Sequence, residues 1–195
     1  MDKSEIKKNK LSKEIDELLN TISYVHPEDI PQIDLYMDQV TTFMEKYLSD
    51  SKRHPGDKVL TKTMINNYAK SRVLPAPEKK KYSPEHLQVL IFIYYLKSFL
   101  SINDVHSLLS PVIESHFKNE DDMDLSGVYE EIVEKCKALL PELRSDLKAK
   151  LDIAFSGYED EKDSDSLKMF SFICMLSFDI FKKKQLIENI LDKLY

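Results

Sequence analysis

Glycine is scarce in this chain, with three among 195 residues. Because β-hairpins and phosphate-cradling loops consume glycine, its scarcity favours a largely helical fold. Neither G-x-G-x-x-G nor G-x-x-x-x-G-K occurs, so nucleotide binding through a glycine-rich loop is not expected. The sequence therefore predicts a mainly α protein and gives no reason to expect a cofactor.

Cysteine and long apolar runs are scarce as well. Cys136 and Cys174 are the only cysteines, and the first ten residues, MDKSEIKKNK, lack the apolar segment of a signal peptide. Two thiols without an export signal favour the reducing cytoplasm. The most apolar run, MFSFICMLSFDIF, is interrupted by Asp179 and is too short to span a bilayer, so we expect no membrane partner.

Motifs for metal binding and catalysis are missing too. The five histidines never occur at H-x-x-x-H spacing; they lie at positions 26, 54, 86, 106 and 116. Neither cysteine has a nearby ligand, EF-hand spacing does not occur, and no nucleophile elbow is present. We therefore predict no metal site and no catalytic residue, and an enzyme is the least favoured class of function.

Apolar residues recur at helical spacing along most of the chain, and prolines divide the pattern. Pro75 and Pro77 end the third helix, and Pro141 divides or kinks the sixth. The second helix takes its apolar stripe from Ile33, Tyr36, Val40, Phe43, Tyr47 and Leu48. Helices are expected at about residues 11–22, 33–48, 62–72, 84–100, 102–109, 126–155 and 166–194. The only strand expected is in a short wing at residues 76–82.

Capping residues mark where two of these helices begin. Thr61 or Thr63 can cap the third helix. Ser83, with Pro84 at the first helical position, begins the fourth. The run LQVLIFIYYLKSFL in the fourth helix is apolar almost all round, so we expect it to be the central element of the core.

A capping-box pattern follows at the start of the fifth helix. The residues SIND place Ser101 and Asp104 three positions apart, with Asp104 where Glu is more usual. We expect a short helix from there to about Leu109, ending ahead of Pro111.

The third helix has one apolar and one polar face. At 100° per residue, Met64, Ile65 and Tyr68 fall on one side. Asparagine can bond adenine with two hydrogen bonds, threonine can contact phosphate or a thymine methyl group, and lysine supplies positive charge. The opposite side carries groups of these kinds: Thr63, Asn66, Asn67 and Lys70.

Positive charge is concentrated around this helix. Between Lys52 and Tyr82, nine basic residues outnumber two acidic ones, giving +7 in a chain of net charge −6, so the rest carries −13. A basic segment on an acidic body is typical of a phosphate-binding surface. The alternative is that the lysine run forms a solvated turn and the helix is an ordinary amphipathic one.

The order of these elements resembles the DNA-binding half of the MerR family of winged helix-turn-helix regulators. TMINNYAKSRVLPAP lies where that family carries its recognition helix, and KKKYSPEHLQVLIFIYYLKSFLSINDVHSLL resembles its wing, long helix and final helix. More closely, LYMDQVTTFMEKYL, LTKTMINNYAK and DSLKMFSFICMLSFD resemble the YkrK-type family of Gram-positive bacteria, a domain of unknown function. The second resemblance spans most of the chain and implies no established activity.

The MerR resemblance carries over to individual residues only in part. The family's L-R-Y-Y falls on Ile65, Asn66, Asn67 and Tyr68, so asparagines replace the Arg and first Tyr that contact the DNA backbone. Arg72 lies near the apolar side of the helical wheel. The resemblance implies that residues of the helix face the major groove or its flanking phosphates and that a basic wing approaches phosphate. The candidate DNA-binding residues are Lys62, Thr63, Asn66, Asn67, Lys70, Arg72, Lys79, Lys80 and Lys81.

Three regions follow from this interpretation. Residues 1–32 form an N-terminal helical extension, residues 33–112 a winged helix-turn-helix domain, and residues 125–195 a helical C-terminal region. The last helix has more apolar residues between Met169 and Phe181 than one face can hold. The surplus is expected to pack in a C-terminal bundle, to form a homodimer interface, to line an effector pocket, or to combine these roles.

We expect this chain to be a cytoplasmic bacterial regulator that binds double-stranded DNA, as a homodimer if the C-terminal helices pair. The sequence establishes neither the oligomeric state nor whether an effector exists. The alternative function is a helical protein-interaction module that does not bind DNA and uses its aromatic C-terminal helix. The two differ in whether changes at Asn66 and Lys70, or changes in the last helix, abolish binding.

Overall fold

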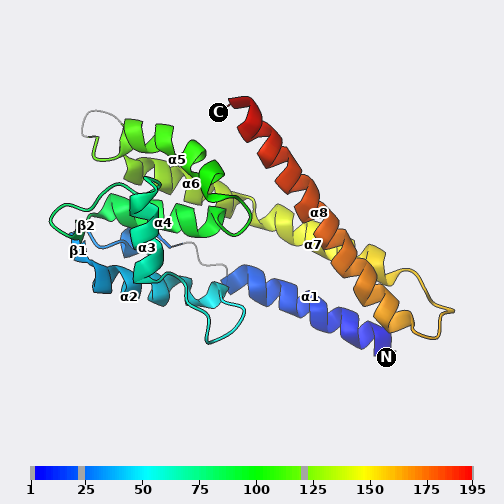
Figure 1. The fold of residues 1–195 in the computed structure, drawn as a ribbon. Coiled ribbons are helices and arrows are strands. Elements are labelled where there is room, and N and C mark those ends of the chain that lie inside the picture. Colours follow the sequence, from blue (N-terminus) through cyan, green and yellow to red (C-terminus); the bar gives the residue numbers. More distant parts are fainter. Residues whose placement is uncertain (1–2, 22–24, 120–122, 195) are drawn as a thin grey trace. The chain divides into compact units, whose positions relative to one another are not determined.

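A computed structural model describes residues 3–21, 25–119 and 123–194 of the chain (Figure 1). Helices dominate it, which confirms the prediction of a mainly α protein. The α-helices are α1 (Lys3–Thr21), α2 (Met37–Leu48), α3 (Lys62–Lys70), α4 (Pro84–Leu96), α5 (Ile102–His116), α6 (Leu125–Ala138), α7 (Leu140–Phe155) and α8 (Ser164–Leu194). Two 3₁₀ turns, η1 (Pro27–Asp29) and η2 (Ser49–Ser51), and two strands, β1 (Leu35–Tyr36) and β2 (Lys81–Tyr82), complete the described elements.

The chain forms two compact units. The terminal unit comprises Met1–Ile22 and Cys136–Lys193, and the central unit comprises Ser23–Lys135 with the last two residues. None of the described helices is long and apolar enough to cross a membrane.

Local capping determines where the central helices begin, as predicted. The Thr61 hydroxyl accepts a hydrogen bond from the Met64 amide at 3.2 Å, so Thr61 rather than Thr63 caps α3. At the start of α5, the Asp104 amide donates to the Ser101 hydroxyl and the Ser101 amide donates to the Asp104 carboxylate, both at 3.1 Å. These contacts confirm the capping box.

The second helix begins later than predicted, because part of its expected stripe is a strand. β1 pairs antiparallel with β2, with Leu35 opposite Tyr82 and Tyr36 opposite Lys81. The side chain of Ile33 is 66% exposed and that of Tyr36 is 55% exposed. Placing these two residues on the apolar face of a helix was therefore wrong. Lys81, the pairing partner of Tyr36, lies 45 positions further along the chain, so helical periodicity alone did not reveal the strand.

The fifth helix runs past the proline at which it was predicted to stop. α5 contains Pro111 and continues to His116. A proline inside a helix removes one backbone hydrogen bond. Here Val112 and Ile113 are half-buried and continue the inner face set by the buried Val105 and Leu109. Packing beyond the proline offsets the lost bond.

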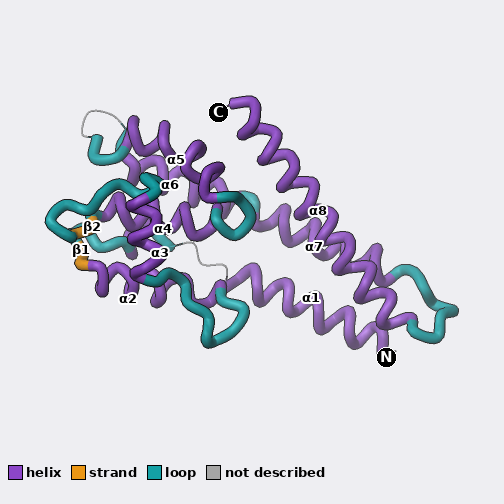
Figure 2. The backbone as a smooth tube through the Cα atoms, in the orientation of Figure 1, coloured by secondary structure: helices purple, strands orange, loops and turns teal. Residues whose placement is uncertain are grey.

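The core of the central unit is built around α4, as predicted. Leu87, Val89, Leu90, Ile91 and Ile93 all lie within it and are at most 1% exposed. The core is completed by residues of the other α-helices of the unit and of both strands, so short helices that would be marginal alone are held by tertiary packing. Figure 2 shows loops at both ends of α3, one from α2 and one leading to β2.

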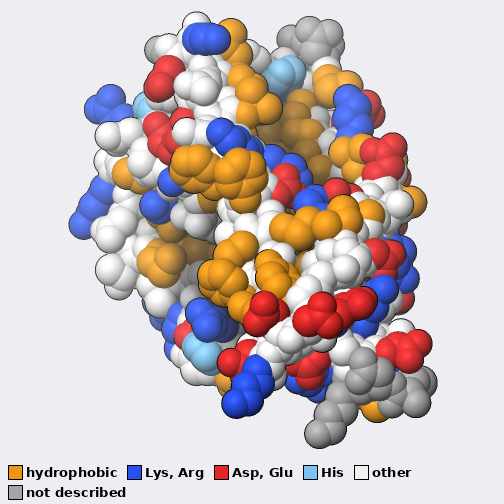
Figure 3. Space-filling view, turned by 90° about the vertical axis from the view of Figure 1, so that its right-hand side faces the viewer, with side chains coloured by type: hydrophobic (Ala, Val, Ile, Leu, Met, Phe, Trp, Pro, Cys, Tyr) orange, Lys and Arg blue, Asp and Glu red, His pale blue; other side chains and the backbone are white. Residues whose placement is uncertain are grey.

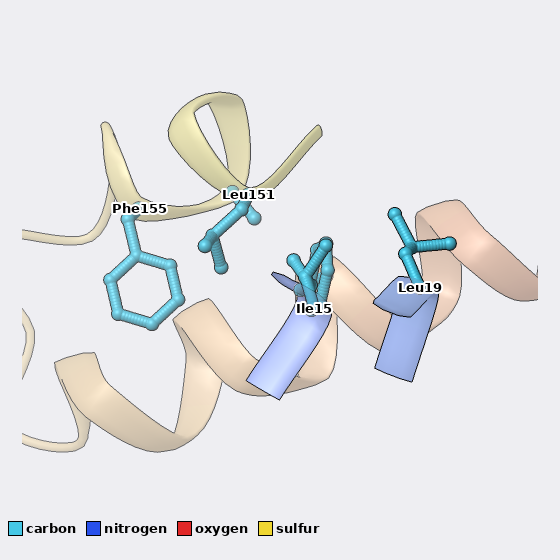
Figure 4. Close-up of a cluster of buried hydrophobic side chains, with 6 residues drawn as sticks. Ile15, Leu19, Leu151 and Phe155 are labelled. Carbon is cyan, nitrogen blue, oxygen red and sulfur yellow. The ribbon is translucent and has the colours of Figure 1, made fainter. Parts of the chain in front are cut away.

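The terminal unit joins the two ends of the chain. Ile15 and Leu19 of α1 point toward Leu151 and Phe155 of α7 in a small apolar cluster (Figure 4), which Phe172 of α8 also joins. α1 begins at Lys3, ahead of the predicted start near residue 11, and the predicted helix end at Ile22 lies outside the described residues.

Ion pairs fix α1 to the later helices of this unit. Asp16 accepts hydrogen bonds from Lys148, at 2.9 Å, and from Arg144. Lys148 and then Arg144 hold the pKa of Asp16 below its usual value. Lys7 pairs with Asp165 of α8 at 2.7 Å. The Lys7 pair joins the first turns of α1 to α8, and the Asp16 contacts join its later turns to α7.

Candidate nucleic-acid interface

α3 presents the polar face that the sequence predicts. Ile65 and Tyr68 are buried, with exposed fractions of 0% and 8%, and they pack α3 into the central unit. Four candidate residues are exposed on the outer side of the helix: Thr63, Asn66, Asn67 and Lys70. α3 lies across α2 and contacts it (Figure 1). The amides, hydroxyl and ammonium group are therefore accessible together on one face of a helix that the core fixes in place.

The end of α3 turns Arg72 outward. The Val73 amide donates to the Tyr68 carbonyl at 3.0 Å, and the Arg72 amide donates to the Ala69 carbonyl at 3.2 Å. These bonds form a Schellman motif, in which the residue after the cap adopts left-handed geometry and is usually glycine. That residue here is Arg72, with φ of 60° and an exposed side chain. The helical wheel placed it near the core because the wheel does not apply beyond Ser71, the cap.

A tight turn carries two more candidate residues ahead of β2. The Lys81 amide donates to the Glu78 carbonyl at 2.8 Å, and the two residues form an antiparallel bridge. Lys79 and Lys80 occupy the central positions with φ of 49° and 66°. Positive φ at both positions is the geometry of a type I′ turn, which favours Asn-Gly. Both side chains are exposed at the tip of this turn.

Left-handed geometry is therefore concentrated in the basic segment. Of the described residues other than glycine, five have positive φ, and Arg72, Lys79 and Lys80 are three of them. For an L-residue this geometry costs about 1–2 kcal/mol. Glycine or asparagine would fit each position with less strain. Strained residues that persist in a structure suggest a role for their side chains.

The remaining two lysines of the set have partners. Lys62 forms an ion pair with Asp38 of α2. Lys81 is half-buried, and its Nζ atom lies 5.4 Å from the centre of the Tyr36 ring. These contacts reduce the positive charge that either lysine offers to a ligand. Sequence reasoning missed Tyr36 and Asp38 as partners because both contacts depend on where β1 and α2 lie relative to α3 and β2.

Four candidate cations keep their charge unpaired. In the part of the chain that the structure describes, Lys70, Arg72, Lys79 and Lys80 form no salt bridge. Glu78, beside the turn lysines, is instead paired with Lys118 at 2.6 Å, and this hydrogen bond lowers the pKa of Glu78. The only acidic residue of the turn is thus held by a lysine from outside it.

A buried histidine supports the base of this turn. His86 is 1% exposed, and its Nδ1 atom accepts a hydrogen bond from the Ser83 amide at 3.0 Å. Its ring meets those of Tyr82 and Phe117 edge-on, at 5.6 and 4.9 Å between centroids. Burial lowers the pKa of His86, so the neutral ring is the stable form in the core.

The connection between α2 and α3 differs from a simple helix-turn-helix. The helix-turn-helix motif joins its helices by a turn of about 3–4 residues. Here the connection includes η2 and continues through Val59 and Leu60, which are 2% and 5% exposed. Lys52 in this segment pairs with Glu45 of α2. The segment is anchored to the core at several points.

The described residues hold no group of three or more His, Cys, Asp or Glu side chains placed to bind a metal ion.

Comparison of the chain with curated proteins and with solved structures gives no match. Residues 25–132, which make up more than half of the chain and nearly all of the central unit, match the family described as "Domain of unknown function (DUF1836)". The chain therefore belongs to this family.

Proposed function

We propose that the central unit binds double-stranded DNA and that the chain acts as a transcriptional regulator of the winged helix-turn-helix type. One observation carries the proposal: Arg72, Lys79 and Lys80 are exposed, free of salt bridges among the described residues, and held in left-handed geometry. On a surface that only contacts water, glycine or asparagine would fit these left-handed positions with less strain than arginine or lysine. On a surface that binds phosphate, the positive charge of the basic side chains offsets that strain.

The arrangement of elements gives further support. β1 precedes α2, α3 follows, and the turn with β2 leads into α4 and α5. This is the order of the MerR-like pattern, with α3 in the place of the recognition helix and residues 78–81 as a short wing. Asn66 and Asn67 would meet base edges, while Lys70, Arg72 and the two turn lysines would contact phosphates.

Two copies of the chain related by a twofold axis would place two α3 helices on the two halves of a palindromic DNA site. The support for a homodimer comes from α8, where Phe170, Ile173, Phe178 and Phe181 are all more than half exposed. Figure 3 shows hydrophobic side chains gathered in patches among charged ones on one face of the molecule. Apolar patches on a surface are typical of interaction sites. We propose that α8 contributes the dimer contact.

Selection of bound fragments from sheared genomic DNA tests the proposal. The wild-type chain should enrich a palindromic site, and the Asn66→Ala/Lys70→Ala pair should lose it while remaining folded, because both side chains are exposed. A matched control is Asn103→Ala/Lys135→Ala, which makes the same chemical changes on α5 and α6. If the control loses as much binding as the test pair, α3 is not the reading element.

Titration with salt provides a second test on the enriched site. Four cations that neutralise phosphates would give a slope of roughly −3 to −4 for log K against log salt per bound copy. A slope near zero would exclude phosphate contacts by the basic segment.

A helical protein-interaction module is the second candidate function, and the exposed aromatic residues of α8 favour it. This function predicts that binding to a protein partner survives the Asn66→Ala/Lys70→Ala change and is lost on Phe178→Ala. Phe178 is 63% exposed, so it is available for such a contact, whereas Phe172 is 6% exposed and belongs to the core.

A further inference from the structure

The inner side of α3 borders a cavity of about 400 Å³. It lies within the central unit, between α3, the end of α4 and the segment that precedes α3. Small-molecule sites are commonly about 300–1,000 Å³ in volume, so the space suits a molecule of one or two rings. Its walls include Leu60, Met64, Tyr68, Tyr94, Tyr95 and Lys97.

The lining is aromatic and apolar with a single charge. Tyr94 and Tyr95 meet edge-to-face, with ring centroids 5.6 Å apart, and Leu60 and Met64 add aliphatic surface. Lys97 is the one charged lining residue, and no lining residue is acidic. Its ammonium group makes one long contact, 3.4 Å to the Leu100 carbonyl, which leaves protons for another acceptor. This chemistry suits a flat aromatic body that carries a negative group.

Tyr68 provides a second polar contact in the wall. Its side chain is 8% exposed, and among the described residues its hydroxyl has no hydrogen-bond partner. The hydroxyl is not fully buried, and Tyr68 is one of the residues that line the cavity. A tyrosine buried to this extent usually has a partner for its hydroxyl. A ligand in the cavity would supply one.

The same residue ties the cavity to the proposed DNA-binding surface. Tyr68 lies on α3 beside Asn67, and its carbonyl accepts the Val73 and Leu74 amides at 3.0 and 3.1 Å. These bonds end the helix and set the direction of Arg72. A molecule that contacts Met64 and Tyr68 therefore touches the element whose outer face would read DNA.

We propose that this cavity binds a small aromatic carboxylate, with Lys97 and Tyr68 contacting the carboxylate and its neighbouring polar atoms, and that occupancy changes the DNA affinity of α3. The small-molecule site is inferred from the cavity alone, whereas its regulatory effect rests on the proposed DNA-binding function. Thermodynamic linkage requires that the carboxylate changes the affinity for DNA by the same factor by which DNA changes the affinity for the carboxylate. An effect of about 5–150-fold is typical of such coupling.

Methyl NMR of the full chain with labelled methionines tests the site, with 2-naphthoate as the probe. The Met64 methyl signal, assigned from Met64→Leu, should shift and saturate, while that of Met44, buried on α2, should not. The neutral 2-naphthamide should bind at least fivefold more weakly. Lys97→Met and Tyr68→Phe should each weaken 2-naphthoate binding at least fivefold, whereas Lys13→Met, an exposed lysine of α1, should not.

The outcomes separate the site from the function. No shift at Met64 up to the solubility of the probe, or equal binding of the amide, overturns the site.

DNA binding on the selected palindrome, with and without saturating 2-naphthoate, then tests the coupling. A change of fivefold or more, matched by the same change in 2-naphthoate affinity when DNA is present, supports it. An unchanged DNA affinity overturns the regulatory part. If 2-naphthoate shifts the Met64 signal but the chain binds no DNA, the regulatory effect and the proposed DNA-binding function are both overturned. The small-molecule site is then still supported.

Discussion

The central and terminal units bury their apolar residues in different ways. Among the described residues, 25 of the 32 buried hydrophobic side chains lie in the central unit, where short helices surround α4. The terminal unit has a cluster of six buried residues and joins α1 to α7 and α8 with ion pairs such as Asp16 with Lys148. Its α8 leaves several large apolar side chains exposed. The central unit thus has the core to hold strained residues at its surface, whereas the terminal unit has apolar surface left for a partner.

Truncation of one core leucine in each unit should show the largest difference. Leu90→Ala should lower the free energy of unfolding of the central unit by about 3–5 kcal/mol, since Leu90 is fully buried in the larger core and its truncation leaves a cavity there. Leu151→Ala in the smaller cluster should cost about 2–3 kcal/mol. Hydrogen exchange measured on peptides from each unit reads the two separately. Equal losses would mean that the two cores are packed alike.

One hydrogen bond in the central unit should have the next largest effect. The Tyr129 hydroxyl donates to the Val25 carbonyl at 2.7 Å, and both residues are at most 2% exposed. Tyr129→Phe leaves that carbonyl without a partner and should cost about 1–3 kcal/mol in a denaturant titration. Tyr158→Phe in the terminal unit, where Tyr158 is 45% exposed, is the matched control. It should change stability by less than about 0.5 kcal/mol.

Relief of the strained turn should stabilise the central unit while weakening its binding. Replacing Lys79 by Asn and Lys80 by Gly gives the residues that a type I′ turn prefers, and should add about 1 kcal/mol to the free energy of unfolding. The DNA affinity should fall, because two phosphate contacts are lost. Tyr158→Gly removes a left-handed residue of the terminal unit, where φ is 62°, and should leave DNA binding unchanged. A double substitution that stabilises the protein and keeps full affinity would exclude a role for the turn lysines.

Acid should weaken the central unit before the terminal unit. Burial, and next the nearby Lys118, lower the pKa of His86, while the Ala76 carbonyl, Glu85 and Asp34 act in the opposite direction. The unfolded chain therefore takes up this proton first. Stability is complete above the usual histidine pKa of about 6.5 and declines as the pH falls below it.

In the terminal unit, the pH dependence of stability comes from a carboxylate, Asp16, rather than from a histidine. The pKa of Asp16 is lowered, so its contribution is present above the usual aspartate value of about 3.9 and is lost as the pH falls below that value. Between about pH 6.5 and 4.5, the protection factors from hydrogen exchange, which compare each amide with its intrinsic rate at the same pH, should fall in the central unit only. His86→Gln keeps a side chain that can cap α4 and should remove this pH dependence. Its persistence in the variant would assign the effect to another histidine.

Local signals predicted much of the central unit. Thr61, Ser83 and Ser101 marked the starts of three helices, because a cap depends on residues within one turn. The polar face of α3 followed from helical spacing. Prediction failed at Tyr36, which pairs with Lys81 far along the chain, and at Pro111, where packing of later residues outweighed the proline. The cavity behind α3 could not be predicted, since its walls come from three separate segments.

The sequence by itself determined that this protein is mainly helical, where several helices begin, and that positive charge gathers between Lys52 and Tyr82. These properties depend on composition and on neighbours within a few residues. Only the tertiary structure decided that α1 packs with α7, that Lys62 and Lys81 have partners while Arg72 and the turn lysines do not, and that those three adopt left-handed geometry. The packing of α1 and the lysine partners arise from contacts between remote segments. The left-handed residues lie in local turns, closed by bonds such as Val73 to Tyr68 and Lys81 to Glu78, which a core that buries many apolar side chains stabilises against local preference.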